Sequence, residues 1–389
     1  MVVSHACFMA INRKVYHLFA QDGWNVELVA PVTLNFPSGK KEAEPQSKGD
    51  PLIHYLNLIG DNPRTYYFKG LETLLFEKKP GIVLLDNDPV SQMALNVGKW
   101  CKKNNAKLFC ISNENLPLDI FSSIKRRGWK NLPATIAKRI LLFKTKKVVD
   151  GIFTINNEGK QIFRTEGYKQ VEKTPLGFDP SYFYPDNQTR ETLRTKLKLT
   201  KPVIAYFGRL TKEKGIHILI KALEGLKEQE WILMMDGFDE YASGYTKEIH
   251  QLLKDGGIMK RVVFISPSHY EIGGYMNTAD IVVIPSVSAP HWKEQYGRVA
   301  AEAMACGKLV VASDSGALPQ LIDKFGILFP EGDIKALKTI LLNILTESTS
   351  EYAIHSSNSI ADYAKERLSV NQQKSIMIES FNKAKLDNN

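Results

Sequence analysis

KEQYGRVAAEAMACG, residues 293–307, contains two glutamates eight positions apart, Glu294 and Glu302, on either side of a glycine turn. Gly297 relaxes the backbone there, so the next two amides can approach an anion closely. The helix predicted to begin after this glycine directs its positive end at the same anion. Glu302 lies over one turn inside that helix, where it can accept hydrogen bonds from a diol such as ribose. The stretch suits a diphosphate, although two glutamates alone are explained more simply by a solvated helix start.

Two further strand ends carry similar features. VIAYFGRLTKEKG (203–215) predicts a buried strand followed by the cations Arg209, Lys212 and Lys214, and then by a helix. Cations at the carboxyl end of a strand face the crevice where open α/β sheets hold ligands. KLVVASDSGALPQLI (308–322) predicts another buried strand, whose turn contains Gly316. Each feature alone is typical of an ordinary loop, but the three turns together indicate a polyphosphate site.

These segments resemble the nucleotide-sugar-dependent glycosyltransferases of family 4, which are retaining enzymes. The matching stretches are Gly208-Arg209-Leu210 with Lys214-Gly215, 262–286, the glutamate pair with EAMACG (302–307), and 313–322. The resemblance is continuous from about Val203 to Phe329. It is much weaker through the N-terminal half, which matches mainly in its order of strands and helices and in PLGFDPSYFYP (175–185).

The resemblance implies an α/β protein of the GT-B fold, with two Rossmann-like doubly wound parallel-sheet domains facing a deep cleft. It also implies a nucleotide-diphosphate sugar as donor, with uridine preferred to guanosine as the base. We expect Arg209 and Lys214 to bind the diphosphate, Glu294 to bind sugar hydroxyls, and these three to carry catalysis. The expected donor-binding residues are Glu302 for the ribose, and Gly208, Gly297, Arg298, Val299, Ser266 and Gly316.

Retaining transfer can follow two routes. One passes through a glycosyl-enzyme intermediate and needs a carboxylate nucleophile at the anomeric carbon. In the other, a front-face reaction, the leaving phosphate itself receives the acceptor's proton, and the family is generally thought to use this route. The protein then stabilises an oxocarbenium-like sugar and the charge on the departing diphosphate. No metal and no other cofactor is expected.

The N-terminal half departs from the family pattern at two strand ends. Many members carry a Gly-Gly turn after the first strand, where this chain has HACFMAINRK (5–14). Many also carry a histidine at the end of a middle strand, where this chain reads Ile111-Ser112-Asn113-Glu114-Asn115. The candidate acceptor or sugar contacts are His5, Asn12, Glu114 and Asn115. A hydrogen-bonded structural histidine and a plain loop carboxylate explain His5 and Glu114 equally well.

The chain has 389 residues, 43% of them hydrophobic, which is enough for two domain cores. Residues 1–177 are predicted to form an acceptor-binding domain, and residues 178–367 a nucleotide-sugar-binding domain. A C-terminal helix within 368–389, centred on 371–386, is expected to cross back to the first domain. The predicted first-domain strands are 2–5, 26–30, 52–58, 82–86, 107–112 and 151–155, and the helices are 12–21, 66–77, 89–104, 134–147 and 157–166.

The net charge of +9 is concentrated in one segment, residues 121–147. No acidic residue lies between Asp119 and Asp150, whereas nine lysines and arginines stand beside Phe121, Trp129 and an Ile136, Ile140, Phe143 stripe. Basic charge beside apolar side chains suits an anionic bilayer surface. The alternative is that the stripe faces the domain core and the cations are solvated.

Other functions are disfavoured by missing features. The sequence has no helix-turn-helix or ribonucleoprotein motif, so nucleic acid is not an expected partner. Asp86-Asn87-Asp88 has the spacing of a metal-binding Asp-x-Asp, but is interpreted as a strand-end turn and helix cap. The four cysteines form no Cys-x-x-Cys pair, and no signal peptide or spanning helix is expected, so we predict a cytoplasmic or peripheral membrane protein.

The preferred function is transfer of a sugar to a glycan or lipid-linked acceptor in the synthesis of a cell-surface polysaccharide or glycolipid. A nucleotide-sugar epimerase or a non-catalytic nucleotide-binding relative is the alternative. A phosphorylase would need a pyridoxal cofactor and a much longer chain. The sugar, the acceptor, the linkage and the oligomeric state are left open by the sequence.

Overall fold

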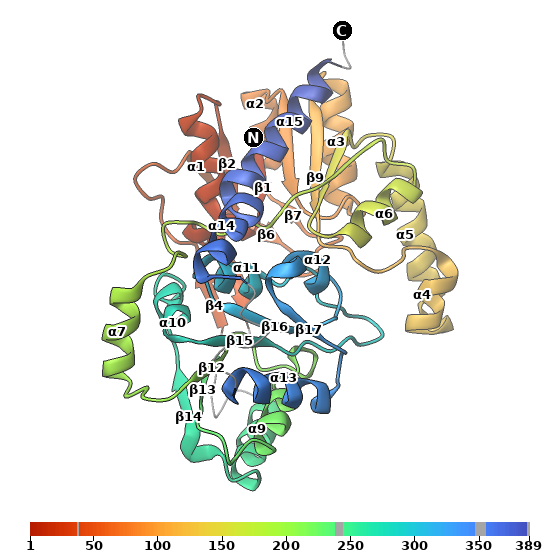
Figure 1. Cartoon of the computed structure of the whole chain (residues 1–389). Helices are drawn as coiled ribbons and strands as arrows, with labels where there is room; N and C mark the ends of the chain where they lie inside the picture. Colours follow the sequence, from red (N-terminus) through yellow and green to blue (C-terminus); the bar gives the residue numbers. More distant parts are fainter. Residues whose placement is uncertain (37–38, 238–243, 347–354, 387–389) are drawn as a thin grey trace. The chain divides into compact units, whose positions relative to one another are not determined.

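A computed structural model of the chain describes residues 1–36, 39–237, 244–346 and 355–386 (Figure 1). It divides into two compact units: Met1–Gly177 with Val370–Asn389, and Phe178–Ser369. The sequence predicts divisions at 177/178 and 367/368, whereas the structure has them at 177/178 and 369/370. No helix among the described residues is long and apolar enough to cross a membrane.

The first unit is built on a seven-stranded sheet in the order β11-β10-β9-β8-β1-β2-β5. Its strands are β1 (Val2–Ser4), β2 (Glu27–Pro31), β5 (Leu52–Leu56), β8 (Ile82–Asp86), β9 (Lys107–Ser112), β10 (Gly151–Thr154) and β11 (Gln170–Lys173). All neighbouring pairs are parallel. The strand order reverses direction between β1 and β8, and such a reversal opens a ligand crevice at the carboxyl ends of the two strands.

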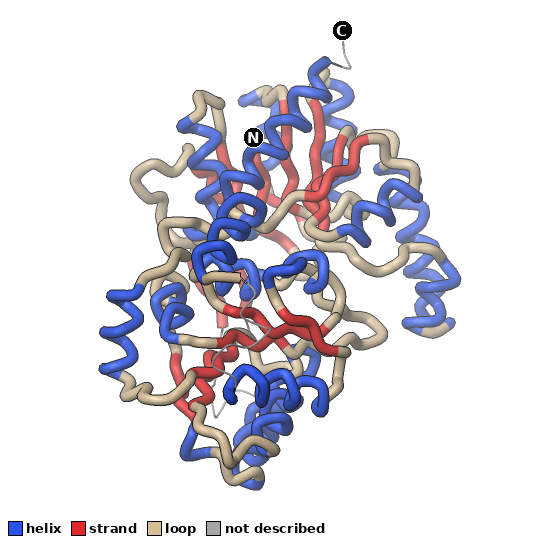
Figure 2. Tube along the Cα trace, in the orientation of Figure 1, coloured by secondary structure: helices blue, strands red, loops and turns tan. Residues whose placement is uncertain are grey.

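Helices cover both faces of this sheet, as the coloured tube shows (Figure 2). They are α1 (Lys14–Gln21), α2 (Leu71–Lys78), α3 (Gln92–Lys103), α4 (Ile120–Arg127), α5 (Leu132–Thr145), α6 (Asn157–Thr165) and α15 (Val370–Leu386), with short 3₁₀ turns η1 (Ala6–Phe8), η2 (Ala10–Arg13) and η3 (Trp129–Asn131). Successive side chains of a strand point to opposite faces of the sheet. Since helices cover both faces, the strands carry apolar side chains on both sides.

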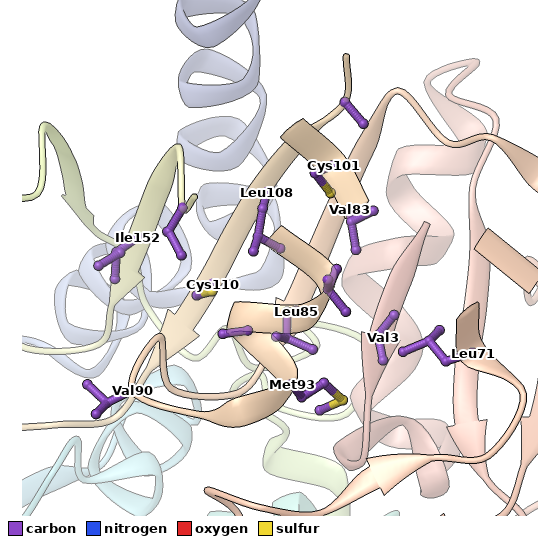
Figure 3. Packing of buried hydrophobic residues seen from close by; sticks show 14 of the residues in the cluster. Val3, Leu71, Val83, Leu85, Val90, Met93, Cys101, Leu108, Cys110 and Ile152 are labelled. Carbon is purple, nitrogen blue, oxygen red and sulfur yellow. The ribbon is translucent and has the colours of Figure 1, made fainter. Parts of the chain in front are cut away.

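One face of the sheet packs Val83, Leu85 and Leu108 into a buried cluster with α2 and α3 (Figure 3). The other face is covered by α15, whose Phe381 lies 4.7 Å from Phe109, measured between ring centroids, in an edge-on arrangement. The last described helix of the chain therefore belongs to the core of the first unit.

The predicted helix 66–77 was wrong in its first turn, because Tyr67–Phe68 forms strand β7 against β6 (Leu58–Ile59). Gly70, in the left-handed region at φ 89°, then separates this strand from α2. The sequence did not predict α4 or the hairpin of β3 (Thr33–Phe36) and β4 (Gly39–Glu42). The hairpin is polar with little apolar periodicity, and α4 has only eight residues.

The second unit contains a six-stranded parallel sheet in the order β14-β13-β12-β15-β16-β17. Its strands are β12 (Val203–Tyr206), β13 (Ile232–Asp236), β14 (Val262–Ile265), β15 (Ile281–Ile284), β16 (Leu309–Ser313) and β17 (Ile327–Phe329). The order reverses between β12 and β15, which makes the carboxyl ends of these two strands the expected ligand-binding edge.

The helices of the second unit pack on both faces of this sheet. They are α7 (Asn187–Lys196), α8 (Ile216–Glu224), α9 (Gly244–Asp255), α10 (Ile272–Thr278), α11 (Arg298–Ala305), α12 (Leu318–Ile322), α13 (Ile334–Thr346) and α14 (Ser357–Leu368), with 3₁₀ turns η4 (Lys212–Lys214), η5 (Met259–Arg261) and η6 (Asp323–Phe325). The sheet thus holds the turns after β12, β15 and β16 on a rigid base.

Candidate active site

The turns after β12 and β15 lie against one another at the reversal point of the second sheet. Gly215, at φ 68°, ends the first turn, and a Cβ on it would lie 1.7 Å from the carbonyl oxygen of Pro285. The backbone amide of Val287 donates to the carbonyl of Glu213 over 2.7 Å. Only glycine permits this approach, because any side chain would collide with backbone and the conformation is left-handed.

This approach brings Lys214 and Glu294 together. The Lys214 Nζ lies 2.6 Å from Oε2 of Glu294, and it also lies over the ring of Trp292 at 5.2 Å. The same carboxylate oxygen accepts a hydrogen bond from Ser286 Oγ at 2.8 Å. The Glu294 side chain is only 7% exposed, whereas that of Lys214 is 23% exposed. A partly exposed cation is therefore held in position by a buried carboxylate.

The predicted helix after Gly297 is present as α11, which begins at Arg298. Gly297 is left-handed at φ 90° and provides no side-chain cap, and a Cβ there would lie 2.6 Å from Leu318. Gly316, at φ 54°, packs against the backbone of Glu294, whose carbonyl accepts from the amide of Ala317 at 2.9 Å. The turns after β15 and β16 thus place Glu294 directly before the positive end of α11.

Glu302 lies in the second turn of α11 and is 7% exposed. Its Oε1 accepts from Nε of Arg298 at 3.0 Å, the neighbour one helical turn earlier. Burial raises the pKa of Glu302 to about 7, although the Arg298 charge opposes the shift. Near neutral pH this carboxyl group is therefore poised between its neutral and ionised forms.

We expect Glu302→Gln to stabilise the protein at pH 8 by about 2 kcal/mol and to change little at pH 4. A raised folded pKa means that the wild-type carboxyl stabilises the fold fully below its unfolded pKa near 4.5 and loses this contribution as pH rises to about 7. Chemical denaturation from pH 4 to 8 measures the effect. If the free energies of unfolding of the two proteins differ by the same amount at pH 4 and at pH 8, Glu302 is not desolvated.

The other two predicted donor-binding strand ends, after β12 and β14, each carry an exposed side chain. Gly208 follows β12 and is left-handed at φ 140°, and its carbonyl lies under Gly237, the first residue after β13. The Arg209 side chain is exposed and makes no hydrogen bond or ion pair with any residue in the described ranges. Ser266 is also exposed, but it follows β14 at the sheet edge, two strands away from β12.

The four candidate residues of the first unit fall into two separate groups. His5 and Asn12 follow β1, where His5 Nδ1 lies 3.3 Å from Tyr66 Oη and Asn12 donates to the carbonyl of Ala6 at 2.9 Å. Glu114 and Asn115 follow β9, which is separated from β1 by β8. Asn12 therefore braces its own turn, whereas His5 keeps an exposed ring at the reversal point of the sheet.

Glu114 pairs with Lys138, which the sequence had indicated only as one of the nine cations of residues 121–147. Lys138 of α5 donates to Glu114 Oε2 at 3.2 Å, and the amide of Leu116 donates to Oε1 at 3.2 Å. Burial is also the main reason that the pKa of Lys138 is lowered and that of nearby Asp88 is raised, the latter to about 6. These groups form a partly buried charged cluster at the carboxyl ends of β8 and β9.

The helix-cap interpretation of Asp86 and Asp88 was wrong. Asp86 ends β8 and accepts from Ser4 Oγ at 2.6 Å, and Asp88 accepts from Ser112 Oγ. The cap of α3 is Ser91, whose side chain accepts from the amide of Ala94. Within the ranges that the structure describes, no three His, Cys, Asp or Glu side chains are placed to hold a metal ion.

Residues 188–367 match the family model described as glycosyl transferases group 1. This segment, called the group 1 domain below, is similar to that family over slightly less than half of the chain. It lies within the second unit and contains every candidate donor-binding residue from Gly208 to Gly316.

Curated relatives of this chain include two named glycosyltransferases. D-inositol 3-phosphate glycosyltransferase of Corynebacterium jeikeium is 32% identical over 231 residues, covering 54% of this chain and 54% of the relative. The amylovoran biosynthesis glycosyltransferase AmsK of Erwinia amylovora is 31% identical over 229 residues, covering 54% and 53%. The chain thus spans about half the length of the curated relatives it matches.

Solved structures resemble the chain beyond the group 1 domain. Sucrose-phosphate synthase from Thermosynechococcus elongatus matches with a TM-score of 0.70 at 18% identity, over 98% of each chain. HepE of Anabaena in complex with UDP and glucose matches with a TM-score of 0.69 at 17% identity, also over 98% of each chain. The predicted GT-B fold class, an α/β architecture with two parallel sheets, is confirmed.

Proposed function

We propose that the protein is a retaining family 4 glycosyltransferase that transfers a sugar from a nucleotide-diphosphate sugar, with UDP as the favoured nucleotide. The observation that carries this proposal is the Lys214–Glu294 pair set before the uncapped N-terminus of α11. A cation, helix amides and a carboxylate at one strand reversal suit a diphosphate attached to a polyhydroxylated group. The group 1 domain and the UDP complexes of HepE support the same assignment.

The proposed chemistry is electrostatic. Lys214 and Arg209 neutralise the charge that develops on the diphosphate as the glycosidic bond breaks, and the amides of Arg298 and Val299 add to this. Glu294 accepts hydrogen bonds from sugar hydroxyls and keeps Lys214 in place. The leaving phosphate takes the acceptor's proton, so the step needs no enzyme nucleophile and we propose no metal.

The acceptor is proposed to be a glycan or lipid-linked sugar in polysaccharide or glycolipid synthesis. AmsK is named for amylovoran biosynthesis, and the D-inositol 3-phosphate glycosyltransferases for a different kind of acceptor, so the relatives disagree. We assign acceptor contacts to His5 and Glu114 because they follow β1 and β9, and the carboxyl ends of parallel strands border the ligand crevice of such a sheet. An epimerase would instead invert one ring carbon of the sugar and return the epimeric nucleotide-sugar without an acceptor.

The proposal predicts that one nucleotide-sugar raises the unfolding midpoint of the second unit by several degrees. A ligand at a hundred times its Kd stabilises the folded state by about 2.7 kcal/mol. A panel of UDP-, GDP- and ADP-sugars is measured by thermal unfolding and by slow hydrolysis of the bound donor. UDP should also bind more tightly than 2′-deoxy-UDP, and Glu302→Gln should reduce this preference because the ribose loses its carboxylate.

Two outcomes separate the alternatives. If a UDP-sugar stabilises the protein and is slowly hydrolysed by it, the result supports the transferase. If a UDP-sugar stabilises the protein but is neither hydrolysed nor used for transfer, the result indicates the non-catalytic relative. If no member of the panel stabilises the protein, the donor site is not where we place it and the proposal is wrong.

A further inference from the structure

The segment containing α4, η3 and α5 follows β9 in the first unit, and Figure 1 labels its two helices. Several of its apolar side chains are exposed. Phe121 is 79% exposed and Trp129 is 75% exposed. The apolar stripe on α5 is exposed as well, with Phe143 at 59%. The alternative in which this stripe faces the core is therefore wrong.

The inward side of α5 explains why the stripe faces outward. Lys138 and Arg139 pair with Glu114 and Glu166, and Thr145 Oγ1 lies 2.9 Å from Tyr168 Oη in the core. These contacts fix the rotation of α5 about its axis. Ile136, Ile140 and Phe143 are spaced by four and three residues, so all three then point away from the core.

The cations beside this stripe are of two kinds. Lys138 and Arg139 form ion pairs with carboxylates of the first unit, and Arg126 donates to the carbonyl of Pro117. The remaining cations are exposed: Lys125, Arg127, Lys130, Lys144, Lys146 and Lys147, of which Lys146 also donates to the carbonyl of Glu166 at 3.2 Å. Lys147 Nζ lies 4.6 Å above the ring of Phe143, so charge and apolar surface are directly adjacent.

We propose that this basic–aromatic face binds an anionic lipid bilayer. We define the face as the six exposed cations together with Ile120, Phe121, Trp129, Ile136, Ile140 and Phe143. Aromatic rings next to cations suit the headgroup boundary, where rings enter the apolar layer and cations contact lipid phosphates. No acidic residue lies between Asp119 and Asp150 to repel those phosphates.

Other occupants fit the face less well. A second copy of this chain would bring two faces of the same charge together, which opposes self-association. A soluble polyanion would use the cations but would leave the rings in water. A bilayer uses both, and it also suits the lipid-linked acceptor proposed above, although membrane binding does not depend on catalysis.

The charge contribution is tested with full-length protein and vesicles of equimolar phosphatidylglycerol and phosphatidylcholine. Lys125→Gln, Arg127→Gln and Lys130→Gln are combined, and Arg126 is kept because of its backbone bond. Each cation near an anionic surface contributes up to about fivefold, so the triple variant should raise the vesicle Kd at least tenfold. The matched control replaces three exposed lysines elsewhere on the first unit by Gln: Lys69, Lys99 and Lys103.

The apolar contribution is tested with Phe121→Ser combined with Trp129→Ser. The vesicle Kd of this double variant should rise about tenfold, whereas its affinity for heparin, a soluble polyanion, should not change. Its control, Tyr67→Ser with Phe76→Ser, removes two exposed rings outside the face, 53% and 68% exposed, and should bind vesicles normally. Circular dichroism and UDP-sugar stabilisation check that the variants remain folded.

Three results would overturn the proposal. The intact protein must bind anionic vesicles more tightly than phosphatidylcholine vesicles, and the difference must shrink as salt rises. If it does not, or if the matched controls lose as much binding as the test variants, no docking surface exists at α4–α5. If heparin binding falls equally in the double variant, the partner is a soluble polyanion and not a membrane.

Discussion

Lys214→Met is expected to lower kcat about a thousandfold and to destabilise the second unit by about 2 kcal/mol. The first effect follows because the proposed diphosphate loses a cation that is held within 2.6 Å of Glu294 and aimed by it. The second follows because Glu294, 7% exposed, keeps a buried charge without its partner. Steady-state transfer and chemical denaturation measure the two effects separately.

A double variant distinguishes the two roles of this lysine. Lys214→Met combined with Glu294→Gln removes the unpaired charge, and Gln can still accept the hydrogen bond from Ser286. Stability should return to within about 1 kcal/mol of the wild type, whereas kcat should stay low. If kcat recovers together with stability, Lys214 has only a structural role and our catalytic assignment fails.

The pairing itself shows what the sequence could predict and what it could not. Strand ends, the turn at Gly297 and the start of α11 were all predicted, because apolar runs and glycines are local signals. The contact between Lys214 and Glu294 was not, since 80 residues separate them. It depends on Gly215 packing against Pro285, and this backbone contact leaves no pattern in either segment alone.

Ser286 and Lys138 were missed for related reasons. Ser286 follows the apolar strand β15 and could have been found as a polar residue at a strand end. Lys138 was interpreted as one of nine surface cations, because local sequence cannot distinguish a solvated lysine from one paired with Glu114. The same limit explains why the sequence left the orientation of α5 open, whereas the structure shows its apolar stripe exposed.

Arg209→Ala is expected to lower kcat a hundredfold or more while leaving the free energy of unfolding unchanged. The loss follows because a donor aimed at developing charge contributes on the order of 3 kcal/mol to the transition state. Stability is unaffected because the Arg209 side chain is exposed and pairs with no residue among those described. Few catalytic substitutions are so free of structural side effects, which makes this variant a clean test of charge stabilisation.

Lys212→Ala is the matched control for this experiment. Lys212 lies in the same turn and its side chain is 71% exposed, with only a 3.8 Å approach to Glu248. Removing it lowers the local charge by the same amount as Arg209→Ala. A general effect of the electric field would therefore lower kcat equally in both variants. We expect less than a fivefold loss for Lys212→Ala, and Arg209→Lys should recover only part of the activity because lysine lacks the planar fork that binds two phosphate oxygens. Equal losses at positions 209 and 212 would show that net charge, and not a directed contact from Arg209, supports the reaction.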